Sequence, residues 1–238
     1  MIRRFQMTHF KGKQFKKDII TVAVGYYLRY NLSYREVSEI MSDRGINICH
    51  TTIYRWVQEY SQIIYCFWKK RNKSVGDSWR MDETYIKVKG QWRYLYRTID
   101  SSGLTLDIWL RKNRDSQAAY AFFKRLIKQF GEPRVIVTDK APSLSCAFKQ
   151  LKSEGFFVSS IHRTSKYLNN IIEQDHRPIK KRHKLYQSLR TASSTIKGIE
   201  TIHALYKISQ RDGNLSGFSV IGMATVFLTN FIRCRTSF

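Results

Sequence analysis

The stretch WRMDETYIKVKGQWRYLYRTID, residues 79–100, decides the fold of the larger part of this chain. It divides into two runs, 79–89 and 92–100, that are rich in aromatic and β-branched residues and are separated at Gly90-Gln91. Runs of this composition on either side of a short glycine-containing break are typical of a β-hairpin. We therefore predict two antiparallel strands here.

The residues that follow the hairpin predict the rest of an α/β domain. Residues 104–111 alternate between apolar and polar side chains, which predicts a half-buried third strand. The next apolar residues recur at helical spacing as far as Phe130, and Gly131 and Pro133 are the stop signals of that helix. The short apolar run 135–137 predicts a strand buried on both faces, and Pro142 is placed to begin another helix.

The first 68 residues have a different pattern, which is typical of a small helical unit. The tetrad at 33–36, Ser-Tyr-Arg-Glu, matches a capping box and predicts a short helix that ends near Gly45. A further helix begins at about His50. Two short helices around a glycine-containing turn predict a helix-turn-helix. The side of the second helix that would face a DNA major groove carries Thr51, Thr52, Tyr54 and Arg55.

The charge and composition of the chain point to a nucleic-acid partner inside the cell. Its 42 Lys and Arg residues against 18 Asp and Glu residues give a formal charge of +24, which is unusual for a metabolic enzyme and favours a polyanionic partner. Its four cysteines are scattered without a CxxC pair, which predicts neither a zinc knuckle nor a disulfide framework and favours a reducing cytoplasm. The most apolar stretch, 217–232, is interrupted by polar residues, so we expect no membrane partner.

Two aspartates occupy positions where the predicted strands end or pair. Asp82 lies in the first strand, and Asp139 directly follows the buried fourth strand. If these strands are neighbours, the two carboxylates repel each other unless a cation neutralises them, and Mg²⁺ prefers such oxygen ligands. Taken alone, Asp139 fits equally well as a cap of the following helix.

Three blocks of sequence resemble a known family. They are MDETY at 81–85, VTDKAPS at 137–143 and KYLNNIIEQDHR at 166–177. Together with YYLRYNLSYRE in the helical unit, they resemble the DDE transposases of the bacterial insertion-sequence family numbered six. The resemblance extends from about residue 9 to residue 220, and the 33 residues between Asp139 and Glu173 agree with the family's interval.

The resemblance implies an RNase H-like, mixed-sheet catalytic domain preceded by an all-α helix-turn-helix domain. In that family Asp82, Asp139 and Glu173 would hold two divalent ions, Mg²⁺ or Mn²⁺, for cleavage at the element's terminal inverted repeats and transfer of the 3′ ends into target DNA. Such a pair of ions can activate the attacking hydroxyl and stabilise the leaving oxygen. The competing carboxylates do not occupy the matched motif positions and are interpreted as structural or as supporting the metal ligands; they are Glu83, Asp100, Asp107 and Asp175.

A basic segment follows Glu173. On a helix its cations share the face of Glu173, and they are Arg177, Lys180, Lys181 and Lys184. This pattern predicts a grip on DNA phosphates, with a merely solvated basic face as the alternative. Lys180 matches the basic residue that the family carries seven positions after its glutamate. Pro178 predicts a kink about one turn after Glu173.

The expected organisation is therefore a helix-turn-helix DNA-binding domain at 1–68, a basic linker at 69–78, an RNase H-like catalytic domain at 79–190 and a helical segment at 191–238 that packs on it. The partners would be double-stranded DNA, as terminal repeats and target, and further copies of the chain, because two element ends must be held together. The expected location is the cytoplasm, on the nucleoid. From residue 221 onward the sequence departs from the family's usual tail. An inactive or repurposed transposase-derived DNA-binding protein is thus one alternative, and an RNase H-like nuclease without strand transfer is another.

Overall fold

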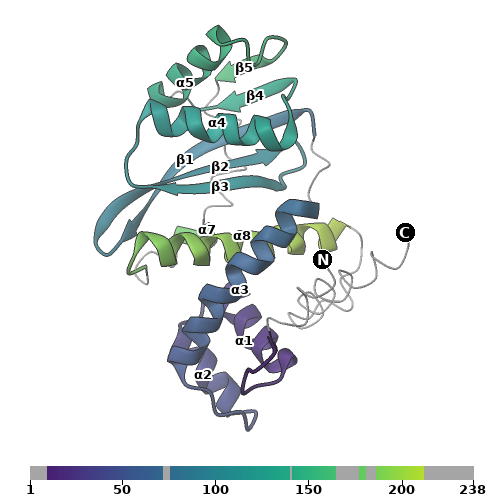
Figure 1. Cartoon of the computed structure of the whole chain (residues 1–238), viewed down its shortest axis with the longest axis vertical. Coiled ribbons are helices and arrows are strands. Elements are labelled where there is room, and N and C mark those ends of the chain that lie inside the picture. Colours follow the sequence, from purple (N-terminus) through teal and green to yellow (C-terminus); the bar gives the residue numbers. More distant parts are fainter. Residues whose placement is uncertain (1–9, 72–75, 140, 165–176, 181–185, 212–238) are drawn as a thin grey trace. The chain divides into compact units, whose positions relative to one another are not determined.

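The computed structural model describes five stretches of the chain, which are residues 10–71, 76–139, 141–164, 177–180 and 186–211 (Figure 1). They fall into two units. One comprises Met1–Tyr60 with Leu205–Phe238, and the other comprises Ser61–Ala204. Helices α3 (His50–Arg71) and α8 (Leu189–Arg211) contribute residues to both, and each unit is described by itself below.

The first unit contains α1 (Lys17–Arg29), α2 (Tyr34–Ser42) and the start of α3. The predicted capping box is confirmed, because the Glu36 amide donates to Ser33 Oγ at 3.2 Å and the Ser33 amide donates to Glu36 Oε2 at 2.5 Å. Gly45, which has a φ of +74°, follows α2 where the chain turns. The core includes four α3 positions, each at most 5% exposed: Ile53, Trp56, Val57 and Tyr60.

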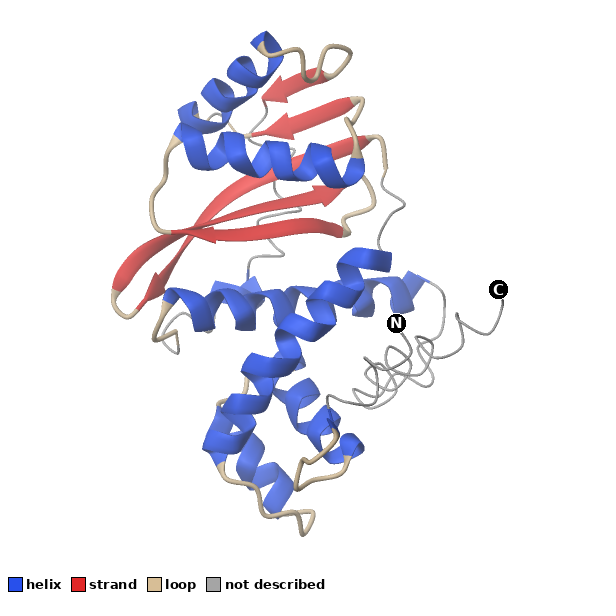
Figure 2. Ribbon diagram, viewed as in Figure 1, coloured by secondary structure: helices blue, strands red, loops and turns tan. Residues whose placement is uncertain are grey.

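The second unit is built on a five-stranded mixed sheet, drawn in red in Figure 2. Its strands are β1 (Ser78–Val88), β2 (Gln91–Asp100), β3 (Thr105–Arg111), β4 (Val135–Thr138) and β5 (Ile161–Thr164). Their order is β3-β2-β1-β4-β5, with β1, β2 and β3 antiparallel and with β4 parallel to both β1 and β5. This order, with helices after β3 and β4, is that of the RNase H-like fold, as expected.

Two helices, α4 (Ser116–Phe130) and α5 (Pro142–Ser153), cover one face of the sheet. Asp115 caps α4 by accepting a 2.6 Å bond from the Ala118 amide, and Gly131, at a φ of +79°, ends it as predicted. Pro142 begins α5, also as predicted. The shared core joins sheet and helix residues that are nearly all fully buried, among them Trp79, Met81, Tyr96, Phe122, Phe123, Leu126, Phe148, Leu151 and Phe157.

The other face of the sheet meets α8. Arg97 on β2 follows Tyr96, which contributes to the first core, so its side chain points to the opposite face. The Arg97 guanidinium lies 2.8 Å from Glu200 Oε2 on α8, and Thr105 Oγ1 donates to the same oxygen at 2.9 Å. All three side chains are buried, so the charges must stay paired for α8 to remain on the sheet.

The prediction of a cleanly alternating, half-buried third strand is wrong at its beginning. The register pairs Thr98 with Asp107 and Ile99 with Thr105, so Leu106 is skipped as in a β-bulge. Thr105 and Asp107 therefore face opposite sides of the sheet, and both are buried. Thr105 contacts Glu200 of α8 on one side, whereas Asp107 contacts Lys69 of α3 and Arg125 of α4.

The beginning of the expected linker also differs from the structure. Residues 69–71 are the last turn of α3, and β1 begins at Ser78. The helix continues because Lys69 Nζ donates to Asp107 Oδ2 at 2.8 Å, and this ion pair holds the end of α3 at the sheet. Both partners lie in the second unit.

Candidate active site and DNA-binding surface

Asp82 and Asp139 come together at one end of the sheet. β1 and β4 are neighbouring parallel strands, and their register pairs Met81 with Thr138. The next residue along each strand is one of the two aspartates. Asp82 is 8% exposed and Asp139 is half-buried. The structure thus places side by side two carboxylates that are 57 residues apart in the sequence numbering.

The surroundings of Asp139 disfavour its negative charge. Burial raises the pKa of this carboxyl, and the charge of Asp82 raises it further. Two groups oppose the shift: the Ala141 amide, which donates to Asp139 Oδ1 at 3.0 Å, and the Arg114 guanidinium. A carboxylate pair with this imbalance is suited to bind a cation. The bond to Ala141 is a capping-type contact, and it is compatible with metal binding because a carboxylate has two acceptor oxygens.

The strand end before Asp139 is fixed by buried contacts. The hydroxyl of Thr138 lies 2.8 Å from His162 Nε2 on β5 and donates to the Asp139 carbonyl oxygen at 3.0 Å. The His162 ring stacks on Phe148, with 4.3 Å between the ring centroids. Burial lowers the pKa of His162, so this ring is neutral at pH 7 and acts as a packing and hydrogen-bonding group.

The third expected carboxylate, Glu173, lies outside the described residues. The same holds for Lys181, Lys184 and the side chain of Arg177. Within the part of the chain that the structure describes, no three His, Cys, Asp or Glu side chains gather closely enough to hold a metal ion.

Glu83, the neighbour of Asp82, faces the other side of the sheet and has its own partners. The Arg114 guanidinium donates to Glu83 Oε2 at 2.5 Å, and Ser143 Oγ donates to Glu83 Oε1 at 3.0 Å. Burial raises the pKa of the Glu83 carboxyl. This agrees with the structural role expected for it. Arg114 is a site residue that the sequence pattern missed, because it lies in a loop without periodicity.

Asp100 and Asp107 are also structural, as expected. Asp107 Oδ2 accepts from Lys69 at 2.8 Å and from Arg125 Nε at 2.7 Å, and Asp107 Oδ1 accepts from the Tyr65 hydroxyl. The carboxylate of Asp107 is fully buried, so these donors replace its water. Asp100 Oδ1 accepts from Leu104 N at 2.9 Å and shapes the turn between β2 and β3. Asp175 lies outside the described residues.

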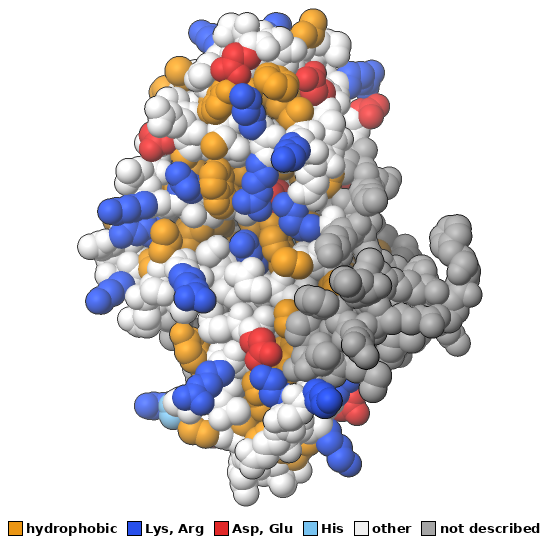
Figure 3. Space-filling view, in the orientation of Figure 1, with side chains coloured by type: hydrophobic (Ala, Val, Ile, Leu, Met, Phe, Trp, Pro, Cys, Tyr) orange, Lys and Arg blue, Asp and Glu red, His pale blue; other side chains and the backbone are white. Residues whose placement is uncertain are grey.

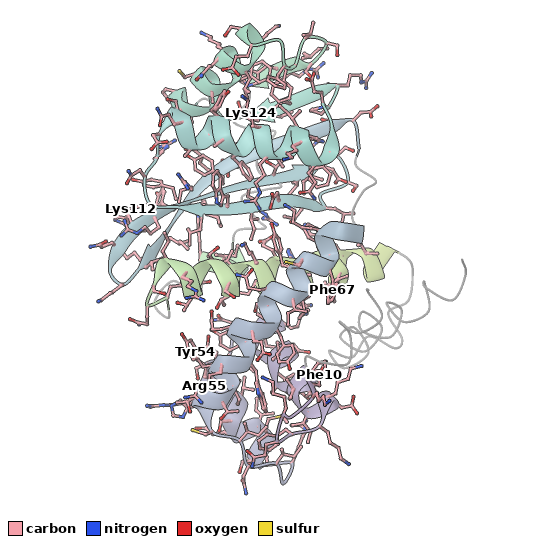
Figure 4. All side chains as sticks on the ribbon, in the orientation of Figure 1. Phe10, Tyr54, Arg55, Phe67, Lys112 and Lys124 are labelled. Carbon is pink, nitrogen blue, oxygen red and sulfur yellow. The ribbon has the colours of Figure 1, made fainter. Side chains whose placement is uncertain are left out.

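The expected DNA-facing residues of the first unit lie on the first two turns of α3. Thr51, Tyr54 and Arg55 are exposed and Thr52 is partly exposed. In Figure 4, Tyr54 and Arg55 project from the helix. The Tyr54 ring meets Tyr34 edge to face at 5.4 Å, which fixes its direction. This face of α3 therefore presents hydroxyl and guanidinium groups at the surface of the first unit.

The electrostatics of the aspartate pair give a first testable prediction. The fold raises the pKa of Asp139, so the folded state favours the protonated carboxyl. The resulting contribution to the free energy of unfolding is fully present below the unfolded-state pKa of about 3.9, and it is lost as pH rises through the folded-state pKa and the carboxyl becomes charged. Asp139→Asn removes the charge but keeps an oxygen for the Ala141 amide. We expect the variant to have a higher free energy of unfolding than the natural chain at pH 7 in chelator. This gain should shrink toward pH 3. Urea unfolding at both pH values tests this, and a less stable variant at pH 7 would refute it.

Comparisons with known proteins found a matching family profile, similar curated proteins and similar solved structures. A protein-family profile described as a DDE domain, of the IS240 transposase group, matches residues 76–209. The transposase for the insertion sequence-like element IS431mec of Staphylococcus aureus strain N315 is 57% identical over 224 residues, covering 94% of this chain and 100% of that protein. The transposase for IS257 in transposon Tn4003, also from Staphylococcus aureus, has the same identity and coverage. The HTLV-2 integrase catalytic core domain in complex with magnesium aligns at 21% identity and a TM-score of 0.37, covering 65% of this chain and 88% of that chain.

The mixed sheet of the second unit, with Asp82 within β1 beside Asp139 at the end of β4, is the catalytic unit of a DDE enzyme. The two staphylococcal transposases match the chain along their entire length, and the match covers 94% of the chain, so it extends beyond the second unit. The chain belongs to the family of insertion-sequence transposases that contains the IS431mec and IS257 proteins. None of the helices within the described stretches is both long and apolar enough to cross a membrane.

Proposed function

We propose that this transposase binds the terminal inverted repeats of its element, cleaves the DNA 3′ ends and joins them to target DNA in a divalent-metal-dependent reaction. The observation that carries the proposal is the juxtaposition of Asp82 and Asp139 on neighbouring strands. Two carboxylates whose charges repel each other are unfavourable when they are empty, but a bound cation neutralises them. A protein that only binds DNA has no need of such a pair.

The metal ligands in this proposal are Asp82, Asp139 and Glu173, with Mg²⁺ or Mn²⁺ as the ions and two ions in each site. The donor set fits, because hard divalent cations prefer carboxylate oxygens and keep open positions for phosphate oxygens. Bound ions supply activation of the attacking hydroxyl and stabilisation of the leaving oxygen. The chain itself orients the ligands: the Ala141 amide donates to one Asp139 carboxylate oxygen, and the Thr138 hydroxyl donates to the Asp139 carbonyl oxygen.

DNA recognition in this proposal is divided between the two units. Residues 1–68 act as the helix-turn-helix domain, in which Thr51, Thr52, Tyr54 and Arg55 face the bases of the repeat. In the catalytic domain, at 79–190, the phosphates near the metal site are bound by Arg177, Lys180, Lys181 and Lys184. The charge of +24 supports a polyanionic partner. Two ends must be cut and joined together, so the active form is a homo-oligomer, working in the cytoplasm on the nucleoid.

Arg55 tests the recognition helix. Arg55→Ala in the full chain should weaken binding to the terminal repeat by about 1–3 kcal/mol relative to random DNA, because a guanidinium that pairs with a base edge carries that much discrimination. Competition binding with repeat and random duplexes measures it. Glu59→Gln is the control, since Glu59 lies on the same helix and pairs with Lys13 instead. An equal loss on both duplexes would place Arg55 on phosphate and contradict base recognition.

Strand transfer tests the proposal as a whole. The full chain is incubated with a labelled duplex ending in the terminal repeat, with a supercoiled target plasmid and with Mg²⁺. We expect labelled strand joined to the plasmid. Cleavage of the duplex without joining would point to the nuclease alternative, and binding without either reaction would point to a DNA-binding protein without activity.

A further inference from the structure

The hairpin of β1 and β2 carries an exposed aromatic pair that the active site does not use. Tyr85 is 58% exposed and Trp92 is 50% exposed. Their rings meet edge to face at 5.1 Å. Both side chains stand on the hairpin beyond the part of the sheet whose residues form the core with α4 and α5. Large exposed rings that contact each other form an apolar surface, and such surfaces are typical of binding sites.

A lysine ammonium group also lies over each of these rings. Lys87 Nζ lies 4.8 Å from the centroid of the Trp92 ring, and Lys180 Nζ lies 5.8 Å from the centroid of the Tyr85 ring. Residues 84–96 contain no Asp or Glu but three basic residues, which are Lys87, Lys89 and Arg93. Figure 3 shows Lys and Arg side chains along the left edge of the view, where Figure 1 places the hairpin. The partner of this surface is therefore negatively charged.

A ligand that has both a flat apolar face and a negative charge fits this arrangement. Nucleotides have both: the base stacks on an aromatic ring while the phosphate meets an ammonium group. Inside a duplex the faces of each base are covered by its neighbours. Only an unpaired or terminal nucleotide can offer a face to Tyr85 or Trp92.

We propose that Tyr85 and Trp92 form a stacking surface for unpaired nucleotides of the DNA substrate, with Lys87 and Lys180 binding their phosphates. The inference rests on the proposed function for the nature of the substrate. Tyr85 lies three residues after Asp82 on β1, about 10 Å along the strand, and strand alternation places its side chain on the face of Glu83, opposite that of Asp82. Because β4 pairs with β1 only as far as Met81, the path proposed for unpaired nucleotides from the cut end to Tyr85 runs around the edge of β1 beyond Met81.

The test compares two DNA probes in binding assays with the full chain and without divalent ions. One probe is a duplex carrying the terminal repeat, and the other is the same duplex extended by a short single-stranded thymine tail. We expect the natural chain to bind the tailed probe about tenfold more tightly. Trp92→Ala and Tyr85→Ala should each remove most of this preference. Val158→Ala, which shortens an apolar side chain that is 72% exposed but lacks a ring, should keep it.

Three outcomes would overturn the inference: an unchanged tail preference in Trp92→Ala, an equal loss of both probes in that variant, or a change in its oligomeric mass with the preference intact. The last would make the surface an interface between copies of the chain. Thermal unfolding confirms that each variant is folded. The assay needs no cleavage, so its outcome is separate from the proposed function. Strand transfer without tail preference would refute only this inference, and tail preference without strand transfer would refute only the proposed function.

Discussion

Asp82→Asn, Asp139→Asn and Glu173→Gln should each reduce DNA cleavage and strand transfer by on the order of 10³-fold or more. Each change keeps the shape of the side chain and removes a negatively charged oxygen ligand. Because the three residues would share one pair of ions, no two of them suffice. Gel assays of cleavage and joining in Mg²⁺ measure the loss. Binding to the terminal repeat should survive, because its contacts come mainly from the first unit.

Two carboxylates of the same unit serve as controls for these variants. Glu83→Gln removes a charge directly beside Asp82, but this side chain faces Arg114 and Ser143 on the other side of the sheet. Glu154→Gln removes a partly exposed charge that pairs with Lys124. Both variants should retain much more activity than Asp82→Asn. If Glu83→Gln is inactive while Asp82→Asn still cleaves and joins DNA, the strand register and the motif alignment are both wrong.

Asp107→Asn should lower the free energy of unfolding by about 3–5 kcal/mol, because it leaves two partly buried cations without the fully buried carboxylate that pairs with them. Asp107 is fully buried and accepts from Lys69, Arg125 and Tyr65. These partners come from α3 and α4, so one carboxylate ties two helices of the second unit to the edge strand. Urea unfolding measures the effect.

Lys13→Ala is the matched control for this variant. It breaks an ion pair of the same length, 2.8 Å, in which both side chains are partly exposed. Exposed pairs contribute at most about 1 kcal/mol, so this variant should remain close to the natural chain. If Asp107→Asn costs no more than Lys13→Ala, the buried network does not hold the second unit together.

The parts of the fold that the sequence predicted are those set by neighbouring residues. The capping box at Ser33 and the end of α4 at Gly131 depend on contacts within a few positions, so local patterns were sufficient. The β1–β2 hairpin is equally local. In the same way, Asp82 could be assigned to the first strand and Asp139 to the position directly after the fourth. That they are neighbours depended on the strand order, which the family resemblance supplied and periodicity alone did not.

The features that the sequence did not predict depend on distant partners. Asp107 meets Lys69 across 38 positions and Tyr65 across 42, so no local pattern shows that residues 69–71 continue α3 as helix. The bulge at Leu106 reverses the side to which Thr105 points, and simple alternation cannot show such a reversal. Arg114 was missed for a related reason, since only the folded sheet brings it to Glu83 and Asp139.

The central claim is that Asp82 and Asp139 hold the same divalent ions, and Mn²⁺ binding tests it most directly. Electron paramagnetic resonance can follow the titration of Mn²⁺ into the full chain without DNA chemistry. We expect Asp82→Asn and Asp139→Asn each to weaken Mn²⁺ binding by at least about tenfold, while Glu154→Gln binds Mn²⁺ like the natural chain. Mn²⁺ binding that is unchanged in both aspartate variants would contradict the claim.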